Sequence, residues 1–334
     1  MKKFLILTLL ISFLIFPLPK SEAARGIFIG WEGGIDECST TASTFSRDDT
    51  TFVSGSSSLR INPTGASVGN CGFRGYTATG LDDAAAFSAA TAYYKFMFRA
   101  DTIPTSTTGE EIMNIRNTSN TMKATARINS NGTLTLYNNS TVAVATSTTA
   151  LSASTWYRLE WKIGTAAGAS AAYELKINGT SEFSGTAALG TVNNGGGQLG
   201  KVTDRGGANV DYYYDDLSVD DTDYPGDTHI LYLSPNASGT LSSWTAGTVP
   251  SDFTTIDERI RNNADYIVSN TALGPNTLAQ FEFQDTSLAG IAGTINGLKL
   301  ITALLENTSG VTNPQIAFWS NNVIASTTGL TGLT

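Results

Sequence analysis

The sequence predicts an all-β protein built from antiparallel β-sandwiches. Short runs that alternate apolar and polar residues repeat along most of the chain, and each run ends at Gly, Asn, Asp or Ser. Glycine is abundant, with 33 residues, and only 15% of the 334 residues are charged, which is typical of chains with many turns. The hydrophobic content of 41% is ample for packed cores.

Between residues 26 and 219 we count about eleven such runs. Two of the predicted strand pairs are joined by Asn-Gly turns, one in KATARINSNGTLTLYN and one in YELKINGTSEF. Strict alternation in WYRLEWKI predicts one core-facing side. That side consists of Tyr157, Leu159, Trp161 and Ile163.

A second block follows the turn Tyr224-Pro225-Gly226-Asp227, which should end the preceding strand and redirect the chain. Strand patterns continue in THILYLSP, LAQFEFQD and QIAFWSNN. They are few for two sheets, so we expect this second β-sandwich to be incomplete and the sequence to be truncated. The expected division is a signal peptide at 1–24, a first sandwich at 25–221, an acidic linker and turn at 222–227, and the second sandwich at 228–334.

The N-terminal sequence MKKFLILTLLISFLIFPLPKSEAAR combines two lysines, an apolar stretch and small residues before Ala24. This is the pattern of a secretory signal peptide, and the apolar stretch is shorter than the ~20 residues that a membrane-spanning helix needs. We therefore expect a secreted chain, extracellular or periplasmic, with no membrane segment after cleavage. Export favours a disulfide between Cys38 and Cys71, and two unlinked thiols are the alternative.

Charge and motifs disfavour several functions. The formal net charge of -9 repels nucleic acid and anionic lipid. A retaining glucanase needs Glu, Asp and Glu alternating on one strand, whereas glycines interrupt the acids of GWEGGIDE. His229 is the one histidine, too few for a zinc site, and we expect it to be structural or at the surface. The glycine-rich NNGGGQLGK lacks the ending of a phosphate-binding loop and is expected to be a flexible loop of the sheet.

The order of FIGWEGG, SSLRIN, WYRLEWKIG, YELKINGT and VDYYYDDLSVDD resembles the laminin-G-like, concanavalin A-like domains. This resemblance covers residues 26–221. It implies an antiparallel jelly-roll β-sandwich whose first and last strands are adjacent. That family includes lectins, adhesion modules, glycan lyases and glucanases, so the implied partner is a glycan or a cell-surface polymer. The order of GDTHILYLSPNASGTLSSWTAG, FTTIDERIRNNADYIVSN and LAQFEFQD, within residues 226–320, is similar to a segment of tailed-phage minor structural proteins. Those proteins normally lack a signal peptide.

Polar residues on the central strands are candidates for ligand binding. Arg116, Arg127, Thr135 and Tyr137 could line one surface if their strands are neighbours. Guanidinium groups suit acidic sugars, and an aromatic ring can stack on a pyranose. Polysaccharide lyases of this fold can work with Tyr, Lys or Arg, which leaves a lyase open. The alternative is that these side chains simply face solvent.

The resemblance also implies a structural calcium ion between a carboxylate near the first strand and an Asp at the end of the last strand. Glu32 in WEGG and Asp216 in YYYDDLSV stand at these positions, and calcium prefers carboxylate and carbonyl oxygens. The alternative is a solvated strand end with an acidic linker. Strict alternation predicts two sides for the last strand, with Tyr212, Tyr214, Asp216 and Ser218 on one and Tyr213, Asp215, Leu217 and Val219 on the other.

We therefore expect a secreted, non-catalytic protein whose lectin-like first domain binds a carbohydrate or another surface polymer. A phage-type virion protein, either structural or receptor-contacting, is the alternative, and it is supported by the second block. A polysaccharide lyase ranks third, because it is supported by the implied fold and a few polar residues. The sequence leaves the ligand and the oligomeric state open.

Overall fold

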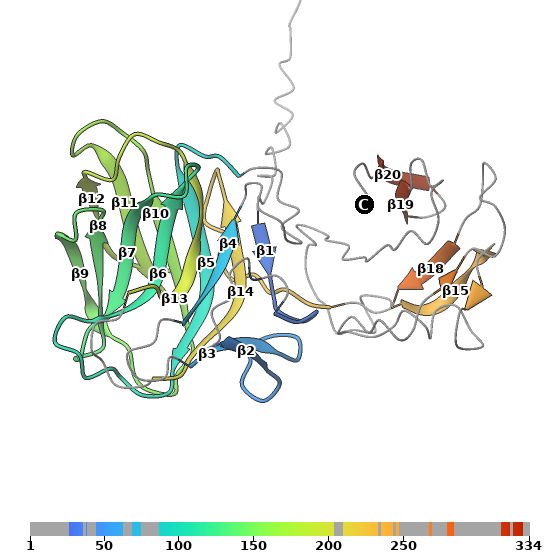
Figure 1. Cartoon of the computed structure of the whole chain (residues 1–334), viewed down its shortest axis with the longest axis horizontal. Coiled ribbons are helices and arrows are strands. Elements are labelled where there is room, and N and C mark those ends of the chain that lie inside the picture. Colours follow the sequence, from blue (N-terminus) through green and yellow to red (C-terminus); the bar gives the residue numbers. More distant parts are fainter. Residues whose placement is uncertain are drawn as a thin grey trace, which may run out of the picture.

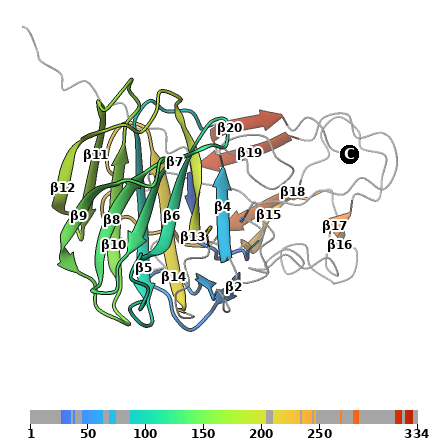
Figure 2. The same ribbon diagram turned by 60° about the vertical axis from the view of Figure 1, so that its left-hand side comes forward.

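The computed structural model describes residues 27–35, 38, 45–62, 69–74, 87–203 and 210–232, and the backbone of several strands between 235 and 329. In this part of the chain, no helix has the length and apolarity of a membrane span. The predicted signal peptide lies outside the described residues. The main body is a sandwich of two antiparallel sheets (Figures 1 and 2), which confirms the predicted all-β fold.

Sheet A has eight strands in the order β12-β11-β10-β5-β14-β3-β2, and β1 also pairs with β14. One edge of β14 is shared between two partners, because its first residues pair with β3 and its last residues pair with β1. The first and last strands of the sandwich are therefore adjacent, as the resemblance implied. The bounds are β1 Ile27–Ile29, β2 Phe45–Asp48, β3 Ser58–Ile61, β5 Ala92–Ala100, β10 Tyr157–Ile163, β11 Ala171–Ile177, β12 Thr180–Ala187 and β14 Tyr212–Asp220.

Sheet B has six strands in the order β4-β13-β6-β7-β8-β9. Both predicted Asn-Gly hairpins are present: Gly132 has φ 83° between β7 and β8, and Asn178 and Gly179 have positive φ between β11 and β12. The glycine-rich segment expected to be a loop is instead strand β13. The bounds are β4 Gly69–Arg74, β6 Glu110–Asn117, β7 Met122–Ile128, β8 Thr133–Asn138, β9 Ala143–Ala150 and β13 Asn194–Lys201.

The core lies between the two sheets and is formed by their inward-facing residues. Leu159, Trp161 and Ile163 of β10 are fully buried there and Tyr157 is partly buried, which confirms the predicted inner side of this strand. Alternation produces this arrangement because successive side chains of a strand point to opposite faces. Buried residues of the facing sheet B include Phe73, Met113, Ile115, Ala124, Ala126, Leu134, Leu136 and Leu199.

Strand β14 does not alternate strictly, so the two sides predicted for it are wrong. A β-bulge interrupts its pairing with β5 between Asp215 and Ser218, and Asp216 has φ 52°. The extra residue shifts the alternation by one position, and Asp tolerates this left-handed conformation better than most residues. The apolar core side of β14 therefore consists of Tyr212, Tyr214, Leu217 and Val219, all 0–1% exposed.

After β14, the chain runs across the outer face of sheet A. Residues 224–230, here called the crossing segment, form hydrogen bonds with β11, β10, β5 and β14 in that order. Residues 221–223 are exposed, as expected of a solvated linker, whereas Asp220 is buried. The domain boundary at 221 stays a prediction.

Beyond residue 234, the described backbone forms three two-stranded antiparallel sheets. The predicted second sandwich lies largely outside the described residues and stays a prediction. The pairs are β15 Pro235–Ser242 with β18 Ala279–Phe283, β16 Thr245–Ala246 with β17 Ile267–Val268, and β19 Gln315–Ser320 with β20 Val323–Gly329.

Candidate functional site

The outer face of sheet B carries two of the predicted ligand-binding residues, Arg127 and Tyr137. Arg127 of β7 lies opposite Thr135 of β8, and Tyr137 of β8 lies opposite Thr125 of β7. The guanidinium of Arg127 lies over the Tyr137 ring, with 3.8 Å between Cζ and the ring centroid. Arg127 is 4% exposed and Tyr137 is half-buried. The structure therefore brings these two residues together as a cation-π pair.

A row of buried polar side chains continues this face across β4, β13 and β6. Gln198 of β13 lies directly opposite Asn114 of β6. Its Nε2 donates a hydrogen bond of 3.1 Å to Oδ1 of Asn70 in β4, and Nδ2 of Asn114 donates one of 3.3 Å to Oγ1 of Thr125. We call six residues the polar face: Asn70, Asn114, Thr125, Arg127, Tyr137 and Gln198.

Two amide oxygens of the polar face are buried without a partner. Within the described part of the chain, Oδ1 of Asn114 and Oε1 of Gln198 accept no hydrogen bond. An unsatisfied buried polar group of this kind costs about 1–3 kcal/mol. Most buried polar groups in native proteins are paired, so each exception needs a reason. Both oxygens are shielded from solvent in the described structure, so a ligand hydroxyl reaches them only when neighbouring side chains move aside.

Two glycines lie beside these amides in the strand pairing. Gly72 of β4 lies opposite Gln198, and Gly196 of β13 lies opposite Arg116, so neither position adds a side chain to the face. Gly196 has φ 123°, a conformation that L side chains rarely adopt. Glycine in a strand interior often marks a place where a ligand approaches the backbone.

Arg116, the third predicted ligand-binding residue, serves its own hairpin. Its Nη1 donates hydrogen bonds to the backbone oxygen of Asn120 at 2.9 Å and to Oδ1 of the same residue at 3.3 Å. Asn120 lies in the turn between β6 and β7 and has φ 62°. The structure therefore brings together only two of the three predicted ligand-binding residues. Arg127 contacts Tyr137, whereas Arg116 is hydrogen-bonded to a turn.

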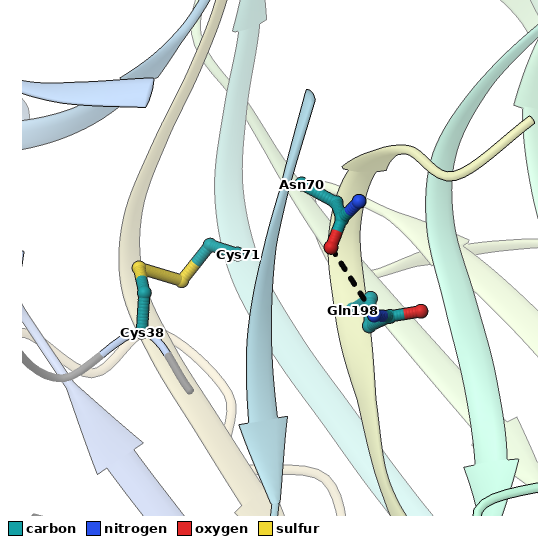
Figure 3. The surroundings of a disulfide bond; sticks show 4 residues. All are labelled: Cys38, Asn70, Cys71 and Gln198. Carbon is teal, nitrogen blue, oxygen red and sulfur yellow. Dashed lines mark hydrogen bonds between the residues drawn. A yellow bond between two sulfur atoms is a disulfide. The ribbon is translucent and has the colours of Figure 1, made fainter. Parts of the chain in front are cut away.

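The disulfide between Cys38 and Cys71 supports one end of the polar face. The two sulfurs are bonded at 2.04 Å, and Cys71 is fully buried in β4. Figure 3 shows that the neighbours Asn70 and Cys71 point to opposite sides of β4, the first toward Gln198 and the second toward Cys38. The covalent bridge therefore holds the strand from its inner side while Asn70 extends the polar row on the other.

Lys123 of β7 is a buried lysine whose three donors are already used. Burial lowers the pKa of Lys123 to about 8. Its Nζ donates to the backbone oxygens of Gly164 and Val192 and to Oγ1 of Thr165. These three acceptors all favour the protonated ammonium. Lys123 therefore acts as a structural cross-link between loops rather than as a base for a reaction.

A second cluster lies at the bulge of β14, beneath the crossing segment. Oδ1 of Asp216 accepts hydrogen bonds from Oγ of Ser54 at 2.6 Å and from the backbone nitrogen of Ile230 at 2.7 Å. Oδ2 of Asp216 lies 2.8 Å from Nδ1 of His229 and 3.8 Å from Nζ of Lys95. The side chains of Asp216 and Lys95 are 0% exposed, whereas that of His229 is 45% exposed. His229 thus lies at the surface and covers a buried carboxyl group.

The loop at residues 53–57 binds two further carboxyl groups, those of Asp215 and Glu32. Burial, and after it the charge of Asp216, raise the pKa of the Asp215 carboxyl to about 8. Burial also raises the pKa of Glu32, against hydrogen bonds from the loop that lower it. The loop donors are the backbone nitrogens of Val53 and Ser54 to Oδ2 of Asp215, and the nitrogens of Ser56 and Ser57 and the hydroxyl of Ser56 to Glu32.

The predicted calcium ligands Glu32 and Asp216 therefore contact the same loop. Calcium takes six to eight oxygen ligands. Here the carboxyl oxygens face N–H and O–H donors, and the ammonium of Lys95 lies beside Asp216. Among the described residues, no group of three or more His, Cys, Asp or Glu side chains could hold a metal ion. This donor set does not fit a bound cation, and calcium at Glu32 and Asp216 stays an untested prediction.

Comparison with known proteins assigns the chain to no family. No family model and no curated protein matches it. Among solved structures, it is similar to an endo-β-1,4-glucuronan lyase from the fungus Trichoderma reesei, with 13% identity, 59% of this chain and 96% of that chain covered, and a TM-score of 0.46. It is also similar to a cellulose-induced protein, Cip1, with 15% identity, coverage of 60% and 100%, and a TM-score of 0.46. Alginate lyase AlgAT5 matches with 14% identity, coverage of 54% and 82%, and a TM-score of 0.39.

Sequence reasoning missed the amides of the polar face. Asn114 lies in EEIMNIRN two residues before Arg116, so alternation places it on the same side of the strand as Arg116, but an amide on that side did not by itself indicate a site. Gln198 follows three glycines in a segment that looked like a loop. The available signal was a polar residue, Gln198, between a glycine and a leucine. The pairing of β13 with β4 and β6 shows that Gln198 lies on the polar face.

Proposed function

We propose that the polar face of sheet B binds a carbohydrate or another extracellular polymer without cleaving it. The observation that carries this proposal is the pair of buried, unpaired amide oxygens on Asn114 and Gln198, next to the stacked guanidinium of Arg127. Groups that reduce stability in the free protein are characteristic of binding sites, where a ligand completes their hydrogen bonds.

The chemistry of the polar face suits sugars. Hydroxyl groups of a glycan can donate to the two amide oxygens once neighbouring side chains move aside, and the positive charge of Arg127 attracts the carboxylate of an acidic sugar. The half-buried ring of Tyr137 offers an apolar surface with a polar edge. These features favour an acidic polysaccharide over a neutral one. The predicted signal peptide is in keeping with a ligand met outside the cell, and export is part of this proposal.

To test the proposal, a glycan array identifies the glycans that the wild-type protein binds. Calorimetry then measures the affinity of the wild-type protein and of Arg127→Ala for those glycans. We expect wild type to bind uronate-containing glycans and Arg127→Ala to bind them at least about tenfold more weakly, which corresponds to about 1.4 kcal/mol. Arg99→Ala is the matched control, because Arg99 also lies over a tyrosine, Tyr213, but on sheet A. Its affinity should equal that of wild type.

Two outcomes would contradict the proposal. The first is that the wild-type protein binds no glycan at millimolar concentrations. The second is that Arg127→Ala and Arg99→Ala lose affinity to the same extent. Incubation with the bound polysaccharide also distinguishes binding from cleavage, because a lyase produces an unsaturated sugar that absorbs ultraviolet light. The phage-type alternative rests on residues 226–320, most of which lie outside the described part, and it stays a prediction.

A further inference from the structure

Lys95 is a charged residue in a position where charge is seldom found. It lies on the outer face of β5, yet its side chain is 0% exposed because the crossing segment lies over it. Burying an ammonium ion is unfavourable unless it is paired and hydrogen-bonded. Nζ donates to the backbone oxygens of Thr228 and Asp216, and it lies 3.8 Å from Oδ2 of Asp216.

The surroundings of Lys95 are rich in carboxyl groups. Asp215 and Asp216 are both 0% exposed, and Glu32 contacts the same loop at 5% exposure. Hydrogen bonds from the loop satisfy the oxygens of Asp215 and Glu32, and the guanidinium of Arg47 is a positive charge that acts on Glu32. In the described structure, Lys95 is the buried cation that contacts Asp216, and the half-exposed His229 is its other basic neighbour.

We propose that the ammonium of Lys95 takes the place of a structural calcium ion at this seam and secures the crossing segment against sheet A. The resemblance implies calcium at Glu32 and Asp216, but the carboxyl oxygens of these residues face N–H and O–H donors and Asp216 faces an ammonium. A bound calcium ion would gather the oxygens of Glu32 and Asp216 around itself. In this structure Lys95 supplies the positive charge, and its Nζ also donates a hydrogen bond to the backbone oxygen of Thr228.

Lys95 therefore links two parts of the chain that are far apart in sequence. It bonds to Asp216, 121 residues away, and to Thr228, 133 residues away. Asp216 in turn accepts the backbone N–H of Ile230. Removal of the ammonium leaves the carboxylate of Asp216 buried without its cation and removes one tie to the crossing segment. Both effects should loosen residues 226–230.

The first experiment measures melting of the full-length protein in millimolar calcium and in excess chelator. We expect the same melting temperature in both. A melting temperature several degrees higher in calcium would overturn the proposal.

The second experiment compares Lys95→Met with Lys162→Met, a control on the neighbouring strand β10 whose lysine is only partly buried. Loss of one partner of a buried ion pair should lower the melting temperature of Lys95→Met by about 6–20 °C. Hydrogen exchange at the Ile230 amide should accelerate at least about tenfold. Lys162→Met should show neither change. The proposal would be overturned if Lys95→Met had the same melting temperature and the same exchange rate at the Ile230 amide as the wild-type protein.

A double variant keeps the test decisive if Lys95→Met does not fold. Lys95→Met with Asp216→Asn removes both charges, so it should melt higher than the sum of the two single shifts predicts. If both single variants fold, strictly additive shifts would show that the two groups are not coupled and would overturn the proposal. If Lys95→Met fails to fold while the double variant folds, the coupling is supported.

Discussion

The outer faces of the two sheets are both polar, but they satisfy their polar groups in different ways. On sheet A, the crossing segment covers the face, and its groups pair with those beneath: Tyr224 with Glu174, Asp227 with Arg158, and the oxygen of Thr228 with Lys95. On sheet B, Asn114 and Gln198 keep unpaired carbonyl oxygens within the described structure. The crossing segment therefore stabilises the outer face of sheet A through these contacts, whereas the two amide oxygens of sheet B are the groups that we propose a ligand engages.

The two cation-π pairs repeat this difference. Arg99 of sheet A lies 5.3 Å from the centroid of Tyr213 and also forms an ion pair with Asp101. Arg127 of sheet B lies 3.8 Å from the centroid of Tyr137 and is more deeply buried. The same two residue types therefore stand in different surroundings. Substitutions that remove a partner on sheet A should lower stability, and those on sheet B should lower affinity.

The largest effect should come from Asp216→Asn on sheet A. Asn tolerates the positive φ at this position, so the change mainly removes the charge that pairs with Lys95. We expect the free energy of unfolding to fall by about 3–5 kcal/mol, measured by urea denaturation. Asp221→Asn, at an exposed position nearby, should change it by less than about 0.5 kcal/mol. Equal effects at the two positions would contradict the distinction between buried and exposed acids.

Removal of the disulfide should give the next largest loss. The double variant Cys38→Ala and Cys71→Ala opens a loop of 33 residues, for which the chain-entropy relation gives about 3–4 kcal/mol. Because β4 also carries Asn70, glycan affinity should fall together with the melting temperature. Reduction of the wild-type protein with a thiol is the matched measurement, and it should reproduce the lower melting temperature.

A near-zero effect on stability is expected for Gln198→Met on sheet B. The variant loses the 3.1 Å hydrogen bond to Asn70, but it also removes a buried oxygen without a partner. These terms are both about 1 kcal/mol and of opposite sign, so the free energy of unfolding should change by less than about 1 kcal/mol. Affinity for the glycan should fall at the same time. A loss above about 2 kcal/mol would show that sheet B uses its amides for stability as sheet A does.

The smallest effect concerns the edge where the two sheets meet. Glu182 of β12 accepts four hydrogen bonds from Thr148 and Thr149 of β9. Partial burial acts to raise the pKa of Glu182, but these hydrogen bonds outweigh it and hold the pKa below its ordinary value. The carboxylate therefore stabilises the fold above its unfolded pKa, and this contribution is lost as pH falls through the lower folded pKa.

For this partly exposed group, solvent screening limits the contribution to about 0.3–0.5 kcal/mol. Glu182→Gln should lower stability by that amount at neutral pH and match wild type in acid. Thermal melting at several pH values measures the difference, and a difference that grows as pH falls would contradict the assigned role.

The sequence predicted features that depend on local patterns. The Asn-Gly turns and the core side of β10 follow from backbone geometry and from the two-residue repeat of a strand that is half-buried. The all-β class followed from the same repeat. Arg127 and Tyr137 were predicted because they fall on the polar side of that alternation, and the structure places them in contact.

Tertiary structure decided what alternation cannot specify. The bulge at Asp216 arises where one strand pairs with β5 on one side and with both β3 and β1 on the other, and it reverses the predicted sides. The sequence near Lys95 and Gln198 did not indicate their partners, because those partners lie 121 or more residues away in sequence. A sequence determines which side of a strand avoids water; only the assembled fold determines which distant group satisfies a buried charge or amide, because that depends on long-range strand pairing.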